Sequence, residues 1–266
     1  MQNFFIHPTF RDHSEGIKTL APLLKVIHKC RQVGIQLAWL NWGITDHDLK
    51  IMPPAVTRGF NKSLSHEKGH GWHVGLGAKL PQEQGGERCL FQGTWNADIY
   101  DPLKEHMTDN DVRFDKARMS GLWSPELPFH KWLRESGKKT LLFAGVNTDQ
   151  CLLGTLTDAY SWGWDCILVG DCAGTMTDVM GAKEVCDYNV ATNMGFVTDS
   201  EAFCAAVSGY LTEARGCSTN EKIPQSAELT GCRARIRIDM CIPQYGGPGA
   251  AGSPWTCGAV SWIPLG

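Results

Sequence analysis

The chain has 266 residues, of which 42% are hydrophobic and 20% are charged, and its formal net charge is −3. This length is sufficient for one large domain with its own core. The composition lacks the basic surplus that nucleic-acid binding needs, which argues against nucleic acid as a partner. No apolar stretch approaches the roughly 18 residues of a membrane span, and the first residues do not resemble a secretory signal. We therefore expect a cytoplasmic protein that does not bind membranes, with free thiols at most of its 11 cysteines.

The first predicted elements are a helix and a strand. From Glu15 to Val33, apolar residues recur at spacings of three and four, which is typical of an amphipathic helix, and Gly34 is suited to end it. Residues 35–42, IQLAWLNW, form the short apolar run of a parallel strand that is covered on both faces. Between Thr45 and Asp111 the pattern becomes polar and broken, and we interpret this part as an insertion near the mouth of an active site.

The second half of the chain alternates between helices and strands. Helices are predicted to end at 131–135 and to cover 149–162 and 179–193, and strands are predicted at 140–144, 166–169 and 195–198. This alternation predicts an α/β fold with three layers and a doubly wound, mostly parallel sheet. Ligands of such sheets bind beyond the carboxyl ends of the strands.

The periodicity ends near Tyr210. The last part of the chain has no sustained pattern and includes the Gly-, Pro- and Ser-rich run QYGGPGAAGSPW. We predict one domain over residues 1–210 and an unassigned, irregular segment over residues 211–266 that lies outside the core.

A cysteine stands where a predicted strand ends and a helix begins. Residues 141–175 read LLFAGVNTDQCLLGTLTDAYSWGWDCILVGDCAGT, with Cys151 at the junction. The N–H groups and the positive partial charge at the start of a helix stabilise a thiolate and can hold an oxyanion. The position fits a nucleophile, and it also fits a buried cysteine packed under the helix.

The same segment resembles the signature of the isochorismatase-like cysteine hydrolase superfamily, which includes nicotinamidases and N-carbamoylsarcosine amidases. The family pattern is G-x-x-T-x-x-C, then T-x-x-D-A, a glycine, and a strand ending in Asp followed by Ala or Cys. The residues that match it at the expected spacings are Gly145, Thr148, Cys151, Thr155, Asp158, Ala159, Gly163, Asp171 and Cys172.

The resemblance implies roles for particular residues. Cys151 would be the nucleophile, and Lys116 stands at the position of the family's catalytic lysine. The backbone N–H groups of Asn147 and Cys151 would form the oxyanion hole. The implied partner is a small-molecule substrate, no cofactor is expected, and relatives are commonly homo-oligomers.

The resemblance also implies a catalytic aspartate in the motif D-x-Q-x-x-F. Residues Met1–Phe5, MQNFF, match this motif from its second letter onward, so the aspartate and the apolar strand that ends in it would precede residue 1. The expected fold therefore lacks its first strand, which is central in the sheet of the family. Nothing about the positions of Asp12, Asp46 or Asp48 suggests a replacement.

Five side chains are candidates for a substrate pocket: Gln2, Phe5, Trp42, Trp95 and Trp123. Gln2 and Phe5 belong to the motif at the start of the chain. The three tryptophans follow strands or lie in the predicted mouth, and core packing explains them equally well.

No metal site is expected. Asp46 and His47 lack a second histidine at the spacing that nicotinamidases use to hold a metal. His66, His70 and His73 have the spacing of zinc ligands on a helix, but the glycines around them favour an exposed loop.

The leading hypothesis is a hydrolase that cleaves a C–N bond of a small amide or carbamoyl compound through a cysteine thioester. One alternative is a catalytically inactive member of the fold that acts as a binding or interaction protein. Another is an isochorismatase-type hydrolase of vinyl ethers. Cys151 favours amide chemistry, because the vinyl-ether branch often has another residue at its position.

Overall fold

The computed structural model describes residues 1–60, 75–177, 181–207, 234–243 and 255–265, the last two ranges by their backbone alone. The first half contains α1 (Asn3–Ile6), α2 (Ser14–Lys18), α3 (Leu20–Gln32), β1 (Ala38–Trp42), α4 (Asp46–Ile51), α5 (Pro54–Gly59), η1 (Gln82–Gln84), η2 (Trp95–Ala97), α7 (Asp101–Lys104) and β2 (Val112–Lys116). The second half contains α8 (Pro128–Glu135), β3 (Thr140–Val146), η3 (Thr148–Leu152), α9 (Leu153–Ser161), β4 (Asp165–Gly174), α10 (Ala182–Asn189), η4 (Val190–Met194), β5 (Phe196–Thr198), β6 (Ala234–Pro243) and β7 (Trp255–Leu265). A further helical segment covers residues 200–207.

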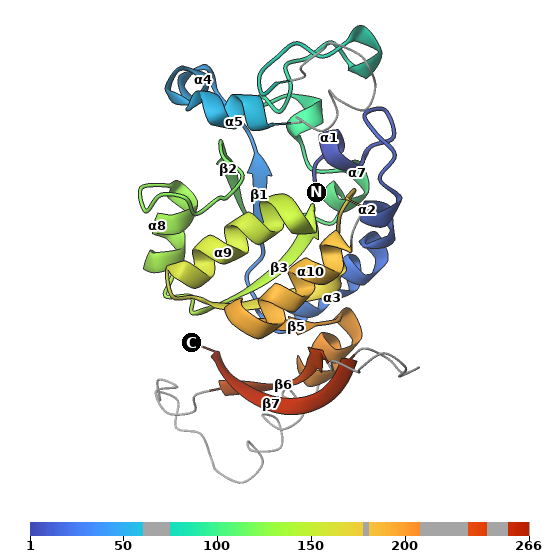
Figure 1. Cartoon of the computed structure of the whole chain (residues 1–266), viewed down its shortest axis with the longest axis vertical. Helices are drawn as coiled ribbons and strands as arrows, with labels where there is room; N and C mark the ends of the chain where they lie inside the picture. Colours follow the sequence, from blue (N-terminus) through green and yellow to red (C-terminus); the bar gives the residue numbers. More distant parts are fainter. Residues whose placement is uncertain (61–74, 178–180, 208–233, 244–254, 266) are drawn as a thin grey trace.

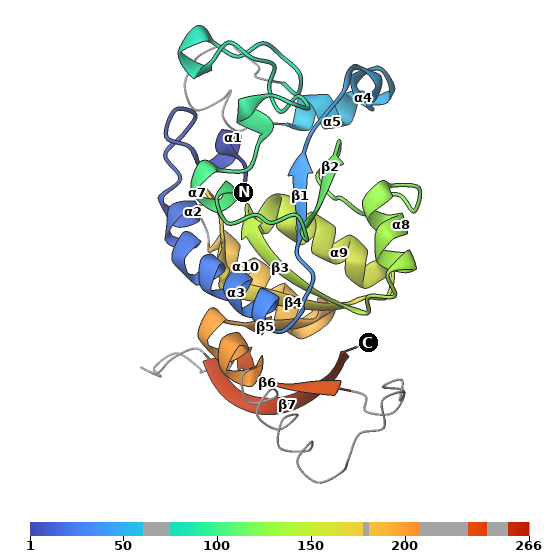
Figure 2. The same cartoon turned by 180° about the vertical axis from the view of Figure 1, so that it is seen from behind.

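The core is a layer of parallel strands between helices. Strand β1 pairs in parallel with β2, and β3, β4 and β5 form a second parallel group in that order. Helices α9 and α10 cover the face seen in Figure 1, and α3 covers the opposite face, seen in Figure 2. The predicted α/β class with a parallel sheet is therefore confirmed.

The parallel layer is interrupted between β1 and β3. No strand pairing joins these two strands in the described part of the chain. The first two residues lie at the interruption. Gln2 hydrogen-bonds to Trp42 at the end of β1. Met1 lies close to Gly145 in β3, since a Cβ atom added to this glycine would be 3.6 Å from Met1 Cγ. The N-terminus accordingly appears near the carboxyl ends of β1 and β3 in both views (Figures 1 and 2). Within the described residues, the outer edges of β1 and β3 at this interruption have no strand partner.

Three buried apolar clusters hold the layers together. One joins α3 to β4 and the segment 200–207, and a second joins α8 and α9 to β4. The third packs the first residues of the chain against Trp42 and the 75–97 region, and Cys151 lies at its margin. All seven cysteines in the side-chain-described ranges are free thiols, as predicted for them. None of the described helices is long and apolar enough to cross a membrane.

Several predicted elements have different bounds in the structure. The helix predicted over Glu15–Val33 is divided into α2 and α3 at Thr19, whose hydroxyl donates to the carbonyl of Gly16 at 2.8 Å instead of facing solvent. Strand β4 continues to Gly174, beyond the predicted end at 169, because it remains buried along most of its length. The described parts of the 45–111 segment contain short helices and no named strand, which agrees with the predicted insertion.

The C-terminal part differs from the expectation of an irregular segment. Strands β6 and β7 pair as an antiparallel hairpin, with Ala234 opposite Leu265 and Pro243 opposite Trp255. The sequence of β6, ARIRIDMCIP, begins with strict alternation of apolar and charged residues, which is the pattern of a strand with one apolar face. The division of the chain near residue 210 remains a prediction.

Candidate active site

Cys151 lies at the carboxyl edge of the parallel layer. It belongs to η3, a single π-helical turn that follows β3 after one residue, so the predicted strand-to-helix junction is present. Its Sγ accepts a hydrogen bond at 3.2 Å from the indole Nε1 of Trp42, the last residue of β1. The hydroxyl of Thr155, another residue of the motif, donates to the carbonyl of Cys151 at 2.8 Å. The thiol is thus fixed where two strands end, and it is only partly buried.

Lys116 lies beside the same cysteine. It ends β2 and is directly paired with Trp42 in the parallel register, and only 5% of its surface is exposed. The ammonium is 4.0 Å from the centre of the Trp42 ring and donates to the carbonyls of Arg118 and Met119 at 2.8 and 2.6 Å. Burial lowers the pKa of Lys116, and the charge of Cys151 and a hydrogen bond to it act in the opposite direction. A cation beside the sulfur favours the thiolate.

Asn147 links β3 to the turn that holds Cys151. The peptide bond between Val146 and Asn147 is cis, and among the described residues the Asn147 N–H has no hydrogen-bond acceptor. Asn147 is 3% exposed, and its side-chain Oδ1 is held by Nε2 of His13 at 2.7 Å. An N–H group without an acceptor at this place is suited to hold an oxyanion.

His13 holds Asn147 through a defined tautomer. Its Nδ1 accepts the N–H of Gly16 at 2.9 Å, so the proton is assigned to Nε2, which donates to Asn147 Oδ1. Burial lowers the pKa of His13, which favours the neutral ring that this arrangement needs. No motif or apolar period in the sequence identifies His13, and its only local signal is its place directly before the first turn of α2.

Replacing His13 by alanine is expected to lower kcat about tenfold with a smaller effect on KM, since one buried hydrogen bond that orients Asn147 is lost. Steady-state kinetics on a hydrolysed amide measure the change, and His13→Gln, which keeps a donor, should recover part of the loss. His28→Ala is the matched control, because His28 is exposed on α3. An unchanged kcat in His13→Ala would contradict the positioning role.

The predicted substrate-binding residues do not all reach Cys151. Trp42 contacts it directly, and Gln2 holds the backbone of Trp42 through its side-chain amide, with hydrogen bonds of 2.6 and 2.8 Å. Phe5 is buried in the same apolar cluster. Trp95 packs on His7 and Phe10, and Trp123 on Arg118. The hydrogen bonds and ring contacts described for the side chains of Trp95 and Trp123 do not involve Cys151 or Lys116.

Burial lowers the pKa of the Met1 amino group to about 6, with the charge of Cys151 raising the pKa and that of Lys116 lowering it. The side chain of Met1 packs against the apolar cluster that contains Trp42 and has Cys151 at its margin.

The acidic residues of the early sequence are engaged elsewhere. Asp46 pairs with Arg88 at 2.8 Å, and Asp48 caps α4 through Thr45. Asp12 is exposed. Among the described residues, no Asp or Glu side chain hydrogen-bonds to Cys151 or Lys116.

No metal site is present among the residues whose side chains are described, because no three His, Cys, Asp or Glu side chains gather there. His66, His70 and His73 lie outside the described residues.

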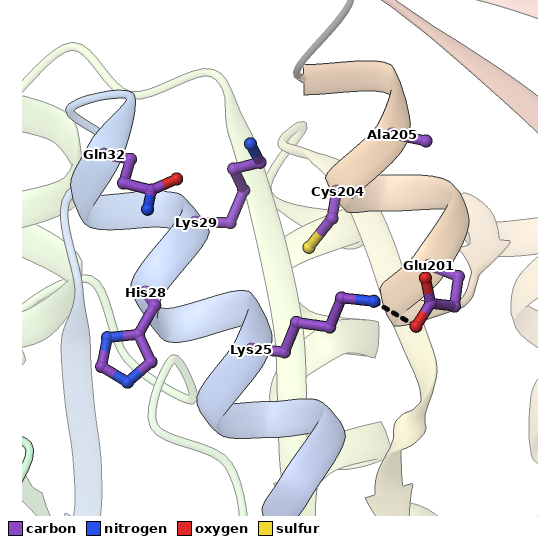
Figure 3. Close-up of a pocket in the computed structure, with 7 residues that line it drawn as sticks. All are labelled: Lys25, His28, Lys29, Gln32, Glu201, Cys204 and Ala205. Carbon is purple, nitrogen blue, oxygen red and sulfur yellow. Dashed lines mark hydrogen bonds and ion pairs between the residues drawn. The ribbon is translucent and has the colours of Figure 1, made fainter.

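A surface pocket of about 500 Å³ lies away from Cys151, between α3 and the segment 200–207 (Figure 3). An ion pair between Lys25 and Glu201 crosses it, and it contains none of the predicted catalytic residues.

These features define an α/β protein with a cysteine and a buried lysine at the carboxyl edge of a parallel layer. The Isochorismatase domain family matches residues 1–202. The chain belongs to this family, as its motif predicted, and it is a hydrolase of the family.

Known proteins agree with this assignment. Ureidoacrylate amidohydrolase RutB of Methylorubrum extorquens is 32% identical over 188 residues, which are 70% of this chain and 68% of the relative. An isochorismatase family protein from Desulfovibrio vulgaris has a similar structure, with a TM-score of 0.59 and 19% identity over 78% of this chain and 94% of that chain. N-carbamoylsarcosine amidase from Thermoplasma acidophilum has a TM-score of 0.54 and 21% identity, over 76% of this chain and 92% of that chain. The two structures share the fold, and the RutB relative supports the family.

Proposed function

We propose that the protein hydrolyses a C–N bond of a small amide or carbamoyl compound through a thioester on Cys151. The observation that carries the proposal is the contact of Cys151 with Trp42, beside the buried ammonium of Lys116. The named activity of the RutB relative, an amidohydrolase, supports the same bond type.

The first half of the reaction forms the thioester. The thiol proton of Cys151 passes to a base, and the sulfur attacks the carbonyl carbon of the substrate. The N–H groups of Asn147 and Cys151 hold the negative oxygen of the tetrahedral intermediate. The nitrogen takes up a proton as its bond to carbon breaks, and ammonia or an amine leaves. Lys116 stabilises the thiolate before the attack. It also helps to orient the acid that gives the leaving nitrogen its proton.

The second half releases the product. Water attacks the thioester carbon, the C–S bond breaks, and the sulfur regains a proton, so that a carboxylic or carbamic acid leaves and the cysteine is restored. In the family, the proton-transferring base is the aspartate of the motif D-x-Q-x-x-F, which residues 1–5 match from its second letter onward.

Ammonia release from a panel of primary amides, N-carbamoyl amino acids and ureido acids tests the proposal. Brief acid quenching followed by mass spectrometry should find the acyl group on the peptide that contains Cys151. Turnover without any acyl group on Cys151 would refute the thioester route, and no turnover on the whole panel would refute the proposed bond type.

Iodoacetamide modification tests the role of Lys116 without any substrate. Lys116→Met keeps the bulk of the side chain and removes the cation, so alkylation of Cys151 at neutral pH should slow about tenfold. Peptide mass spectrometry over time gives the rate, and the exposed Lys131 of α8, as Lys131→Met, is the matched control. Equal rates in the three proteins would show that Lys116 does not stabilise the thiolate.

A binding protein without catalytic activity is the second candidate. The observation that favours it is that no described carboxylate contacts Cys151 or Lys116. Such a protein would bind an amide at this place and leave it intact, which calorimetry combined with the ammonia assay would reveal.

Other expectations from the sequence remain proposals. We propose that the partners are small molecules, not nucleic acids or membranes, that the chain forms a homo-oligomer, and that it works in the cytoplasm. Light scattering after size-exclusion chromatography tests the oligomer, and imaging of the tagged protein tests the location.

A further inference from the structure

Thr155 is a buried threonine of α9 that belongs to the family motif and takes no part in the proposed reaction steps. It is 4% exposed, and its hydroxyl donates to the carbonyl of Cys151 at 2.8 Å. Threonines in helices often bond to the carbonyl four positions earlier, so this bond alone indicates only local packing. The same oxygen, however, accepts the backbone N–H of Gly121 at 3.2 Å. Thr155 therefore joins the turn of the nucleophile to a residue that lies 34 positions before it in the chain.

The segment that contains Gly121 also holds the ammonium of Lys116. Lys116 ends β2, and its Nζ donates to the carbonyls of Arg118 and Met119 at 2.8 and 2.6 Å. These carbonyls and Gly121 belong to one short stretch, residues 117–121, which we call the lysine loop. The position of the ammonium therefore depends on the position of this loop.

The lysine loop is packed tightly between β1 and α9. A Cβ atom added to Gly121 would be 2.5 Å from Cδ2 of Leu40 in β1, which is closer than packed carbon atoms approach. A Cβ atom added to Gly154 of α9 would be 3.4 Å from Cγ of Met119. The hydrogen bond from Gly121 to Thr155 joins the loop to α9 at the same place.

These contacts form a closed ring around the nucleophile. The carbonyl of Cys151 is bonded to Thr155, Thr155 to the lysine loop, and the loop to Lys116. The ammonium lies 4.0 Å from the centre of the Trp42 ring, and the indole donates to the Cys151 sulfur at 3.2 Å. The hydroxyl of Thr155 links the half of the ring that contains the thiol to the half that contains the cation.

We propose that Thr155 is a positioning residue, which holds the lysine loop so that the ammonium of Lys116 stays beside the sulfur of Cys151. The inference rests on the proposed function, because it concerns the same thiol and the same cation. A cation near the sulfur favours the thiolate, and this effect weakens as the two groups separate. Without the hydroxyl, the buried N–H of Gly121 loses its acceptor, and the loop can relax away from α9.

Alkylation of Cys151 tests the inference without any substrate. Thr155→Val keeps the shape of the side chain and removes the hydroxyl, so iodoacetamide should modify Cys151 about fivefold more slowly at neutral pH. Thr155→Ser, which keeps the hydroxyl, should stay within about twofold of the wild-type rate. Thr157→Val is the matched control, because Thr157 is exposed on the same helix, and it should leave the rate unchanged.

A second pair of proteins separates positioning from simple support of the fold. In the Lys116→Met background there is no cation to position, so adding Thr155→Val should change the alkylation rate less than about twofold. Equal slowing in both backgrounds would overturn the inference, since Thr155 would then act without Lys116. An unchanged rate in Thr155→Val with a lower urea midpoint would also overturn it and assign Thr155 a purely structural role. Thr155→Ala removes the same hydroxyl with less bulk and carries the same expectations if Thr155→Val does not fold.

Amide hydrolysis provides a second readout. On an amide that the wild-type protein hydrolyses, Thr155→Val should lower kcat about fivefold and change KM less than about twofold, because the hydroxyl bonds to backbone groups and not to the substrate. A larger change in KM than in kcat would contradict the positioning role. If the wild-type protein hydrolyses none of the amides, the proposed function fails, while the alkylation rates still decide the role of Thr155.

Discussion

Replacing Cys151 by alanine is expected to lower kcat for amide hydrolysis by about 10⁴-fold or more, because the covalent route is lost with its nucleophile. The fold should change little. The sulfur accepts one hydrogen bond from Trp42 and lies at the margin of its apolar cluster, so a methyl group can occupy part of its space. Ammonia release measures activity, and urea unfolding should show a midpoint close to that of the wild-type protein.

Cys30→Ala is the matched control for this prediction. Cys30 is a buried free thiol on α3, in the cluster formed by α3, β4 and the segment 200–207. Removing its sulfur should cost about 1 kcal/mol of stability and leave kcat unchanged. Activity that survives in Cys151→Ala, or falls equally in Cys30→Ala, would show that Cys151 is not the nucleophile.

The local part of the site could be predicted from the sequence. The run that forms β3, followed by a polar turn and an apolar helical pattern, indicates the junction that holds Cys151. The family motif adds Lys116, and the structure places it at the end of β2, next to Trp42 in register. Both signals depend on residues close together in the chain, where the period of the apolar positions or the spacing of a motif is informative.

The remaining part depends on contacts between distant segments. Gln2 reaches Trp42 across 40 positions, and His13 reaches Asn147 across 134. His13 lies between α1 and α2, where no regular period exists to reveal which side chains point inward. Its role follows from tertiary packing, which sequence periodicity does not encode. The alternation in β6 was a local signal, but the surrounding Gly- and Pro-rich composition obscured it.

Adding a strand that ends in aspartate before Met1 is expected to raise kcat/KM at least 100-fold, the contribution typical of a positioned general base. A segment of about six apolar residues is long enough to pair with its neighbours in the sheet. Its place is the interruption between β1 and β3, where Met1 and Gln2 already lie. The added carboxylate would precede Met1, whose side chain is next to Gly145 of β3, and Gln2, which holds Trp42, the hydrogen-bond partner of Cys151.

The same strand ending in asparagine is the control that separates structure from catalysis. Both added strands should raise the urea midpoint by a similar amount, since both supply hydrogen bonds to the facing edges of β1 and β3. Only the aspartate supplies a base for the thiol proton, so only that protein should gain activity. Equal activity of the two would assign the gain to the completed sheet alone. An unchanged midpoint in both would mean that the added strand does not occupy the interruption, and the geometry inferred for the carboxylate would then be wrong.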